Sequence, residues 1–219
     1  MAGIGKAKER CPVCDASRTL CMCDELPQLE LKTKISLVIH HRELLRSSNT
    51  GLLALRTLIN NKIQIRDQAR ATLDLKDLLT PAYRTLLLFP SADAVELDRR
   101  LVDKERRPIQ LIVPDGTWRQ ARKIHSRQRE LEDIPRVKIS TPNHATFQLR
   151  AQSRPEGMAT LQAIAAGLQV IEGAWVGAQL MRLYHARVAR TLSARGFLRA
   201  GALTASSCTC RTGPSLSTR

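Results

Sequence analysis

The feature that most constrains the fold is a series of short apolar runs, each of which breaks at a turn and leads into an amphipathic segment. The clearest runs are KISLVIH (34–40), TLLLFPSADA (85–94) and PIQLIVPDG (108–116). Runs of this length, rich in Leu, Ile and Val, are typical of strands buried on both faces of a sheet. Their alternation with helical segments predicts an α/β fold: a mostly parallel sheet with helices on both faces.

The rest of the chain fits the same scheme. Two shorter strand candidates lie at 63–66 and 135–140, and HHRELLRSSNTG (40–51) is typical of a polar loop. Asn49 and Thr50 are the candidate caps of the first helix. The predicted helices cover 52–59, 73–79, 93–103, 117–131, 159–172 and 174–194. In such sheets ligands bind outside the carboxyl ends of the strands, so the loops after 34–40, 85–89 and 108–113 are expected to converge on one rim.

The rim loop DGTW (115–118) has both a structural and a functional interpretation. Thr117 followed by Gln120 fits a capping box, and Asp115 could equally cap the helix or act on a ligand. Trp118 could stack on a base or pack against the sheet. The helix that follows, WRQARKIHSRQRE, is almost free of acids until Glu130, which favours a phosphate-binding surface over an ordinary solvated face.

Four cysteines near the N-terminus have metal-ligand spacing. Cys11, Cys14, Cys21 and Cys23 read C-x2-C-x6-C-x-C, and four thiolates this close can surround one tetrahedral ion, by default zinc. The alternative is two disulfides, which would need an oxidising compartment. A closed four-cysteine site has no open coordination position, so we expect a structural role. The sequence assigns no role to the pair Cys208 and Cys210.

The charge points to a polyanionic partner. The chain has 35 Lys and Arg against 20 Asp and Glu, a net charge of +15, and between 134 and 219 the only acids are Glu156 and Glu172. Arg-rich surfaces suit phosphate, so nucleic acid is the favoured partner. No run approaches the ~18 apolar residues of a membrane span, and MAGIGKAKERCPVC lacks a secretory h-region. We therefore expect a cytoplasmic protein without membrane contact, and nothing indicates an obligate protein partner.

Together these segments resemble the DTW-domain family, named for an Asp-x-Thr-Trp signature that appears here as DGTW. The paired cysteines, RELLRSSNTG (42–51), LLLFPSADA (86–94), the signature with WRQARK, and RPEGMATLQAIAAGL (154–168) occur in the family's order. The four-residue signature alone would be weak evidence for the family, whereas the ordered set of motifs is specific. The resemblance covers roughly 11–172.

The resemblance implies a SPOUT-like fold with a trefoil knot, a rare exception to unknotted connectivity. It also implies an activity. Family members use S-adenosyl-L-methionine to donate its 3-amino-3-carboxypropyl group, and bacterial members place that group on N3 of a uridine in the tRNA variable loop, releasing methylthioadenosine. The expected function is therefore tRNA-uridine aminocarboxypropyltransferase, with tRNA as partner and zinc as structural ion.

The resemblance and the predicted rim assign roles to individual residues. Asp115 is the catalytic candidate, either as the acceptor of the N3 proton or as the holder of the sulfonium donor. The donor site is expected to comprise Phe89, Pro90, Ser91, Pro114, Asp115, Gly116, Thr117, Trp118 and Thr160. The RNA site is expected to comprise Glu43, Arg46, Asn49, Arg119, Arg122, Lys123 and Arg150. One departure is that Gln162 stands where the family usually has glutamate.

The expected organisation is a zinc module at 1–30, a catalytic domain at 31–200 and a flexible tail at 201–219. Two rival functions remain. A SPOUT-like RNA methyltransferase would share the fold and the donor but transfer another carbon. A non-enzymatic, zinc-containing RNA-binding protein would bind tRNA without binding the donor specifically.

Overall fold

The computed structural model describes residues 11, 13–14, 17–44, 46, 48–66, 75, 78–140 and 157–196. Its centre is a six-stranded sheet in the order β2-β1-β5-β3-β6-β4, in which every neighbouring pair is parallel. The strands are β1 (Lys34–His40), β2 (Asn61–Arg66), β3 (Arg84–Leu88), β4 (Val95–Glu96), β5 (Ile109–Asp115) and β6 (Arg136–Lys138). The predicted parallel α/β sheet is confirmed, and all seven residues of β5 are buried, as its apolar sequence predicts.

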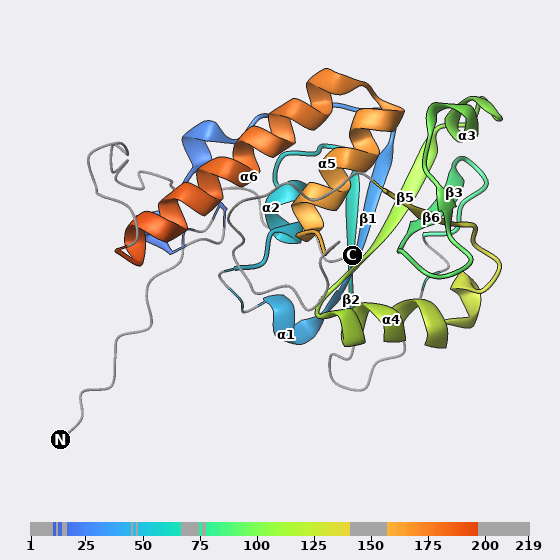
Figure 1. Cartoon of the computed structure of the whole chain (residues 1–219), viewed down its shortest axis with the longest axis horizontal. Coiled ribbons are helices and arrows are strands. Elements are labelled where there is room, and N and C mark those ends of the chain that lie inside the picture. Colours follow the sequence, from blue (N-terminus) through green and yellow to red (C-terminus); the bar gives the residue numbers. More distant parts are fainter. Residues whose placement is uncertain are drawn as a thin grey trace.

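Helices cover both faces of this sheet (Figure 1). On one face, Leu37 and Ile39 pack in a core with α2 (Gly51–Leu55), α5 (Thr160–Ile171) and α6 (Ala174–Ala194). On the other, Val38 and Ile112 pack against α4 (Trp118–Arg127). The period of two along each strand thus divides the apolar residues between two cores. The remaining helices are α1 (His41–Leu44), α3 (Arg99–Asp103) and the 3-10 turns η1 (Arg18–Leu20), η2 (Cys23–Glu25) and η3 (Arg129–Leu131).

Several predicted boundaries were wrong. The helix predicted at 93–103 begins only at Arg99, because Val95–Glu96 pairs with β6 and the Asp98 carboxylate then accepts the Leu101 N–H at 2.7 Å as a cap. The helix predicted at 117–131 ends at Arg127, and η3 follows. The loop predicted at 40–51 contains the short helix α1.

The last two helices match their predicted ranges within two residues. Most of the predicted helix at 73–79, the connection 141–156 and the predicted tail 201–219 lie outside the described residues. The trefoil knot therefore stays a prediction. None of the described helices combines the length and apolar character that a membrane crossing requires.

Candidate functional site

The rim predicted from the strand ends is present. Ile39 on β1 lies opposite Asp115, the last residue of β5, so these two strands end side by side. The short helix α1 begins directly after β1, and α4 begins three residues after β5. Figure 1 shows α1 and α4 at the same end of the sheet. Loops that are distant in the sequence therefore meet where a parallel sheet binds its ligands.

The centre of this rim is the Asp115 carboxylate, which is buried with 4% exposure. Its Oδ2 accepts a hydrogen bond of 2.5 Å from the Asn49 amide, and its Oδ1 accepts one from the Thr160 hydroxyl. Hydrogen bonds to an ionised carboxylate are stronger than neutral ones. Asp115 therefore joins three segments: the end of β5, the loop before α2 and the first turn of α5.

The backbone around this carboxylate leaves little room. A Cβ added at Gly51 would lie 3.0 Å from Asp115 Oδ2 and 3.2 Å from Leu37 Cδ2. The next residue back, Thr50, is buried, and its hydroxyl accepts the Leu161 N–H at 3.2 Å. The first turns of α2 and α5 are thus fastened to each other beside Asp115. Sequence reasoning did not include Thr50 or Gly51 in the site, since only the packing of the two helices reveals them.

The start of α4 is built as predicted. The Thr117 hydroxyl accepts the Gln120 N–H at 3.3 Å, and the Gln120 side chain accepts the Thr117 N–H at 2.7 Å, which is a capping box. Gly116 has φ +154°, and a Cβ there would meet Gln120 at 2.9 Å. Asp115 is not the cap, because it belongs to β5 and its oxygens face Asn49 and Thr160.

Trp118 packs against the sheet. Its ring meets Phe89 edge-to-face with centroids 6.2 Å apart, and it borders the core formed by β3, β5 and α4. The two rings tie the end of β3 to the start of α4. Among the other predicted donor-site residues, Phe89 and Pro114 are buried, Ser91 is half-buried and Pro90 is exposed.

The predicted RNA-binding residues fall into different environments. Arg119 and Arg122 on α4 are exposed, and Lys123 is half-buried. Arg46 is exposed at 52% of its side chain, whereas Glu43 is completely buried and forms an ion pair with it. Asn49 is half-buried and donates to Asp115. Arg150 lies outside the described residues.

Gln162, the residue that departs from the family pattern, caps α5. Its Oε1 accepts the Ala159 N–H at 3.0 Å, and its side chain is buried. A glutamate carboxylate could accept the same bond, so the local capping role does not depend on the charge. This contact fixes the first turn of α5, from which Thr160 reaches Asp115.

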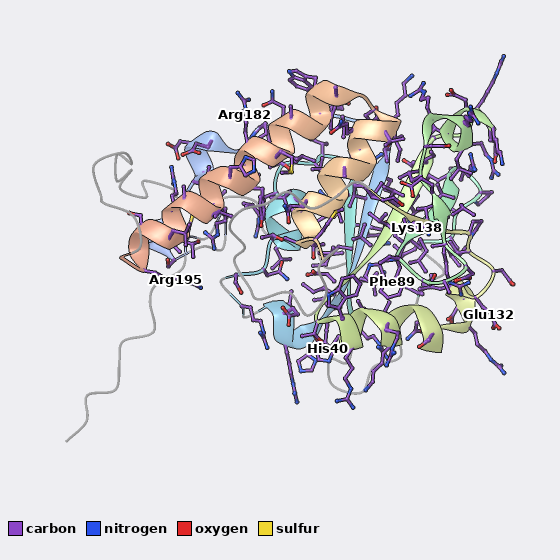
Figure 2. The ribbon with its side chains drawn as sticks, in the orientation of Figure 1. His40, Phe89, Glu132, Lys138, Arg182 and Arg195 are labelled. Atoms are coloured by element: carbon purple, nitrogen blue, oxygen red, sulfur yellow. The ribbon has the colours of Figure 1, made fainter. Side chains whose placement is uncertain are left out.

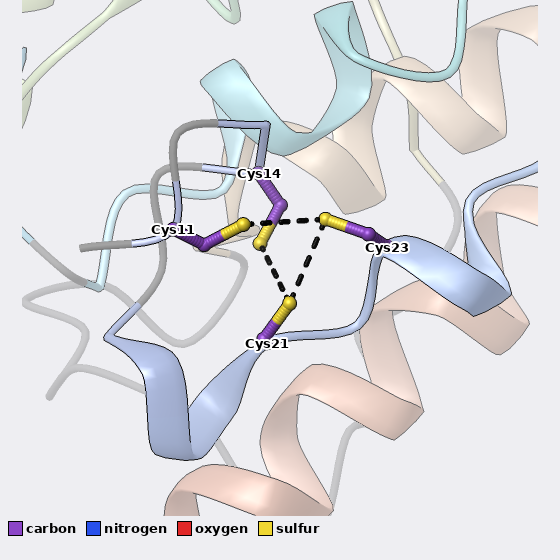
Figure 3. Close-up of side chains that lie close together, drawn as sticks. All are labelled: Cys11, Cys14, Cys21 and Cys23. Atoms are coloured by element: carbon purple, nitrogen blue, oxygen red, sulfur yellow. Dashed lines mark hydrogen bonds between the residues drawn. The ribbon is translucent and has the colours of Figure 1, made fainter. Parts of the chain in front are cut away.

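The four N-terminal cysteines form a compact cluster (Figure 3). Their Sγ atoms all lie within 4.8 Å of one another, and three of the separations are 3.4 Å (Cys11–Cys23), 3.6 Å (Cys21–Cys23) and 3.9 Å (Cys14–Cys21). A tetrahedral zinc ion with Zn–S bonds of about 2.3 Å places its sulfurs about 3.8 Å apart. The cluster therefore fits zinc, and no disulfide joins these four cysteines.

The cysteine cluster docks on α6. The buried guanidinium of Arg187 donates to the Leu20 carbonyl at 3.2 Å, and Arg190 forms an ion pair with Glu25. The segment around the cysteines therefore packs directly on α6, the last helix among the described residues. By contrast, Arg182 on α6 and Arg195, which directly follows α6, are exposed (Figure 2).

Comparison with known proteins places this geometry in context. The chain is similar to tRNA-uridine aminocarboxypropyltransferase 2 of Macaca fascicularis, with 26% identity over 76% of this chain and 58% of that protein. It is also similar to the Drosophila melanogaster protein of the same name, with 29% identity over 75% of this chain and 67% of that protein. The chain thus spans less than two thirds of the macaque relative.

Among solved structures, the SAM-dependent rRNA:acp-transferase Tsr3 from Vulcanisaeta distributa has a TM-score of 0.46 and 18% identity, over 76% of this chain and 81% of that one. The DTW domain matches residues 8–192, which include the cysteine cluster, the DGTW loop and α6. The chain belongs to the DTW-domain family.

Proposed function

We propose that the chain transfers the 3-amino-3-carboxypropyl group of S-adenosyl-L-methionine to N3 of a uridine in tRNA. Uridine N3 loses its proton and forms a bond to the carboxypropyl carbon that is attached to the sulfonium. The bond between that carbon and sulfur breaks. Its electron pair returns to sulfur, so that methylthioadenosine leaves as a neutral thioether. The observation that carries the proposal is the DTW-domain match combined with a buried carboxylate at the rim of a parallel sheet.

The surroundings of Asp115 suit a donor with a positive charge. The hydrogen bonds from Asn49 and Thr160 stabilise the ionised carboxylate, which then offers a fixed negative charge to a sulfonium. Asp115 could also accept the N3 proton, directly or through water. In either role it must be held in place, and the first turns of α2 and α5 hold it. The choice between transferred carbons is positional, because the carbon in line with N3 reacts.

The other predicted donor-site residues would line the donor site on the same rim. Phe89 and Trp118 form an apolar wall from the end of β3 to the start of α4, suited to an adenine or thioether surface. The exposed Arg119 and Arg122 are placed to meet RNA phosphates along α4. Zinc in the closed cysteine cluster would stabilise the N-terminal segment and take no part in the transfer.

The test uses S-adenosylmethionine labelled separately in its methyl and its carboxypropyl carbons, incubated with the protein and unmodified tRNA. We expect label in RNA from the carboxypropyl carbons alone. Transfer of methyl label instead would establish the methyltransferase. An absence of transfer, with tRNA still bound, would favour the RNA-binding protein.

The matched variants are Asp115→Asn, which removes the charge and keeps the shape, and Asp98→Asn at the remote α3 cap. Asp115→Asn should abolish transfer, whereas Asp98→Asn should retain it. Melting curves must show that both variants are folded. Transfer by Asp115→Asn at the normal rate would show that the Asp115 carboxylate takes no part in the reaction.

A further inference from the structure

Glu43 is a buried charge that the proposed reaction does not use. It lies on α1 at the rim, and its side chain has 0% exposure. Its carboxylate Oε1 is 3.2 Å from Nε of Arg46, whose side chain is 52% exposed. Removing a carboxylate from water costs more than an ion pair to a half-exposed partner usually returns. Glu43 also has an interaction beyond the Arg46 pair, so its buried carboxylate is a fixed point against which Arg46 can be positioned.

The ion pair determines where Arg46 can reach. The Arg46 N–H donates to the Glu43 carbonyl at 3.1 Å, and the Asn49 N–H donates to the Arg46 carbonyl at 2.9 Å. These two hydrogen bonds link Arg46 to Glu43 on one side and to Asn49, the residue that donates to Asp115, on the other. Three residues span at most about 11 Å, so the Arg46 and Asn49 Cα atoms lie within that distance. Arg46 is thus near the reaction centre but outside it.

The guanidinium of Arg46 has donors to spare. Its Nε faces Glu43, and within the described part of the chain its two terminal nitrogens make no hydrogen bond or ion pair. The Glu43 carboxylate attracts the guanidinium at Nε as an ion pair, and the two terminal nitrogens form a planar fork, the geometry that matches phosphate oxygens. Arg42, on α1, is also exposed and adds a second positive charge to this segment.

We propose that Arg46 binds a backbone phosphate of the RNA beside the target uridine, and that Glu43 is the positioning residue that aims its guanidinium. The proposal rests on the proposed function, since it requires an RNA substrate. It revises the sequence-based role of Glu43, which acts through Arg46 and does not contact RNA. Asn49, in turn, belongs to the Asp115 centre and not to the RNA surface.

The test is the equilibrium affinity for unmodified tRNA between about 50 and about 300 mM salt, measured beside the affinity for S-adenosylmethionine. Loss of one phosphate contact should reduce the slope of log K against log salt by about 0.7 to 0.9. We expect Arg46→Ala to show this change and to weaken tRNA binding about tenfold at low salt. Its affinity for S-adenosylmethionine should stay within about twofold of the wild type. The control is Arg106→Ala, an exposed arginine in the loop before β5, at the end of the sheet opposite to the rim.

A double-mutant cycle isolates the positioning role. Glu43→Gln keeps the shape and removes the charge, and it should weaken tRNA binding in the wild type but have no further effect in Arg46→Ala. Arg46→Lys should keep the salt slope and lose affinity, since it retains the charge but not the fork. These readouts differ from those of a merely structural glutamate, whose loss would lower the melting temperature equally in both backgrounds.

Three results would overturn the proposal. Weaker S-adenosylmethionine binding by Arg46→Ala, with tRNA affinity unchanged, would assign Arg46 to the donor carboxylate. An equal effect of Glu43→Gln on tRNA affinity in both backgrounds would show that Glu43 does not act through Arg46. If Arg46→Ala bound tRNA as tightly as Arg106→Ala does, Arg46 would not contact an RNA phosphate. A wild type that binds no tRNA would instead refute the proposed function, from which this inference starts.

Discussion

Exchanging the partners of the Asn49–Asp115 hydrogen bond tests whether the buried carboxylate is held as the structure shows. Asn49 has two contacts: its Nδ2 donates to Asp115 Oδ2 at 2.5 Å, and its Oδ1 accepts the Leu52 N–H at 3.0 Å, which caps α2. Asn49→Ala removes both. Leaving a 4%-exposed carboxylate short of a donor costs about 1.5–3 kcal/mol, and a lost cap costs about 1 kcal/mol.

The sum predicts that Asn49→Ala loses about 2.5–4 kcal/mol of unfolding free energy. For a chain of this size that corresponds to a melting temperature lower by about 5–15 °C. The assay is urea unfolding at pH 7 with a thermal melt beside it. A loss below about 1 kcal/mol would refute the reasoning, because it would mean that water replaces the amide without cost.

Asn49→Asp tests the contact with Asp115 more selectively than Asn49→Ala does. It keeps the oxygen that accepts from Leu52 but places a second carboxylate against Asp115, so at pH 7 it should destabilise more than alanine does. The repulsion raises the pKa of one carboxyl of the pair. Stability of this variant should therefore increase as the pH falls through that raised pKa, where the pair shares a proton.

The reciprocal change Asn49→Asp with Asp115→Asn restores one amide and one carboxylate. The amide at 115 can then donate to the carboxylate at 49, and the Thr160 hydroxyl can still donate to the oxygen at 115. We expect the double variant to recover at least half of the stability that Asn49→Asp loses, although it should not recover transfer activity. A double variant no more stable than Asn49→Asp would show that the two side chains do not interact as a pair.

Four further predictions concern other parts of the fold. Removing zinc with a chelator, or changing Cys21 to Ser, should lower the melting temperature by several degrees, and metal analysis should find one zinc per chain; an unchanged melt would contradict the metal site. Gly51→Ala should cost about 1–3 kcal/mol and weaken S-adenosylmethionine binding, measured by calorimetry, because its Cβ would press on Asp115. Gln162→Glu should keep the melting temperature, whereas Gln162→Ala should lose about 1 kcal/mol with the α5 cap. Tyr184→Phe should be neutral or gain up to about 1 kcal/mol in urea unfolding, because the buried Tyr184 hydroxyl makes no hydrogen bond to a described residue. Burial raises the pKa of Tyr184 above its usual 10, so its contribution to stability is present below about pH 10 and lost above it, a decline that Tyr184→Phe should reduce.

The sheet was predictable because its strands are buried on both faces. A strand such as Ile109–Asp115 has no polar face to complicate its pattern, and the turn after it marks its end. The two-residue strand Val95–Glu96 was not predictable, because both residues are exposed and only the pairing with β6 makes them a strand. The start of α3 was misjudged for a different reason. Asp98 is a good helix cap, but several nearby polar residues are equally good, so the sequence does not single it out.

The site was predictable as a set of loops but not as a set of contacts. The carboxyl-end rule indicated that the loops containing Asn49 and Asp115 would lie on the same rim, and the pairing of β1 with β5 brings them side by side. Nothing in the sequence indicated that Asn49 and Thr160 would use the same carboxylate, because that depends on how α2 and α5 pack. Glu43 was assigned to the RNA site because it matches a family position in the loop after β1, and its burial on α1 could not be read from that match.

The burial of Asp115 also explains how an acidic residue can serve in a positively charged region. On the proposed function, the rim must attract phosphates and a cationic donor at once, and an exposed carboxylate would repel the phosphates. Arg46, Arg119 and Arg122 are exposed, whereas Asp115 lies beneath Asn49 and Thr160. Water and salt screen exposed charges over about 8–10 Å, but a buried charge acts at short range in a weaker dielectric. The RNA therefore meets a cationic surface, while a donor that enters the rim meets the carboxylate. The Asn49–Asp115 exchange should separate these effects, reducing donor affinity while leaving the salt dependence of tRNA binding unchanged.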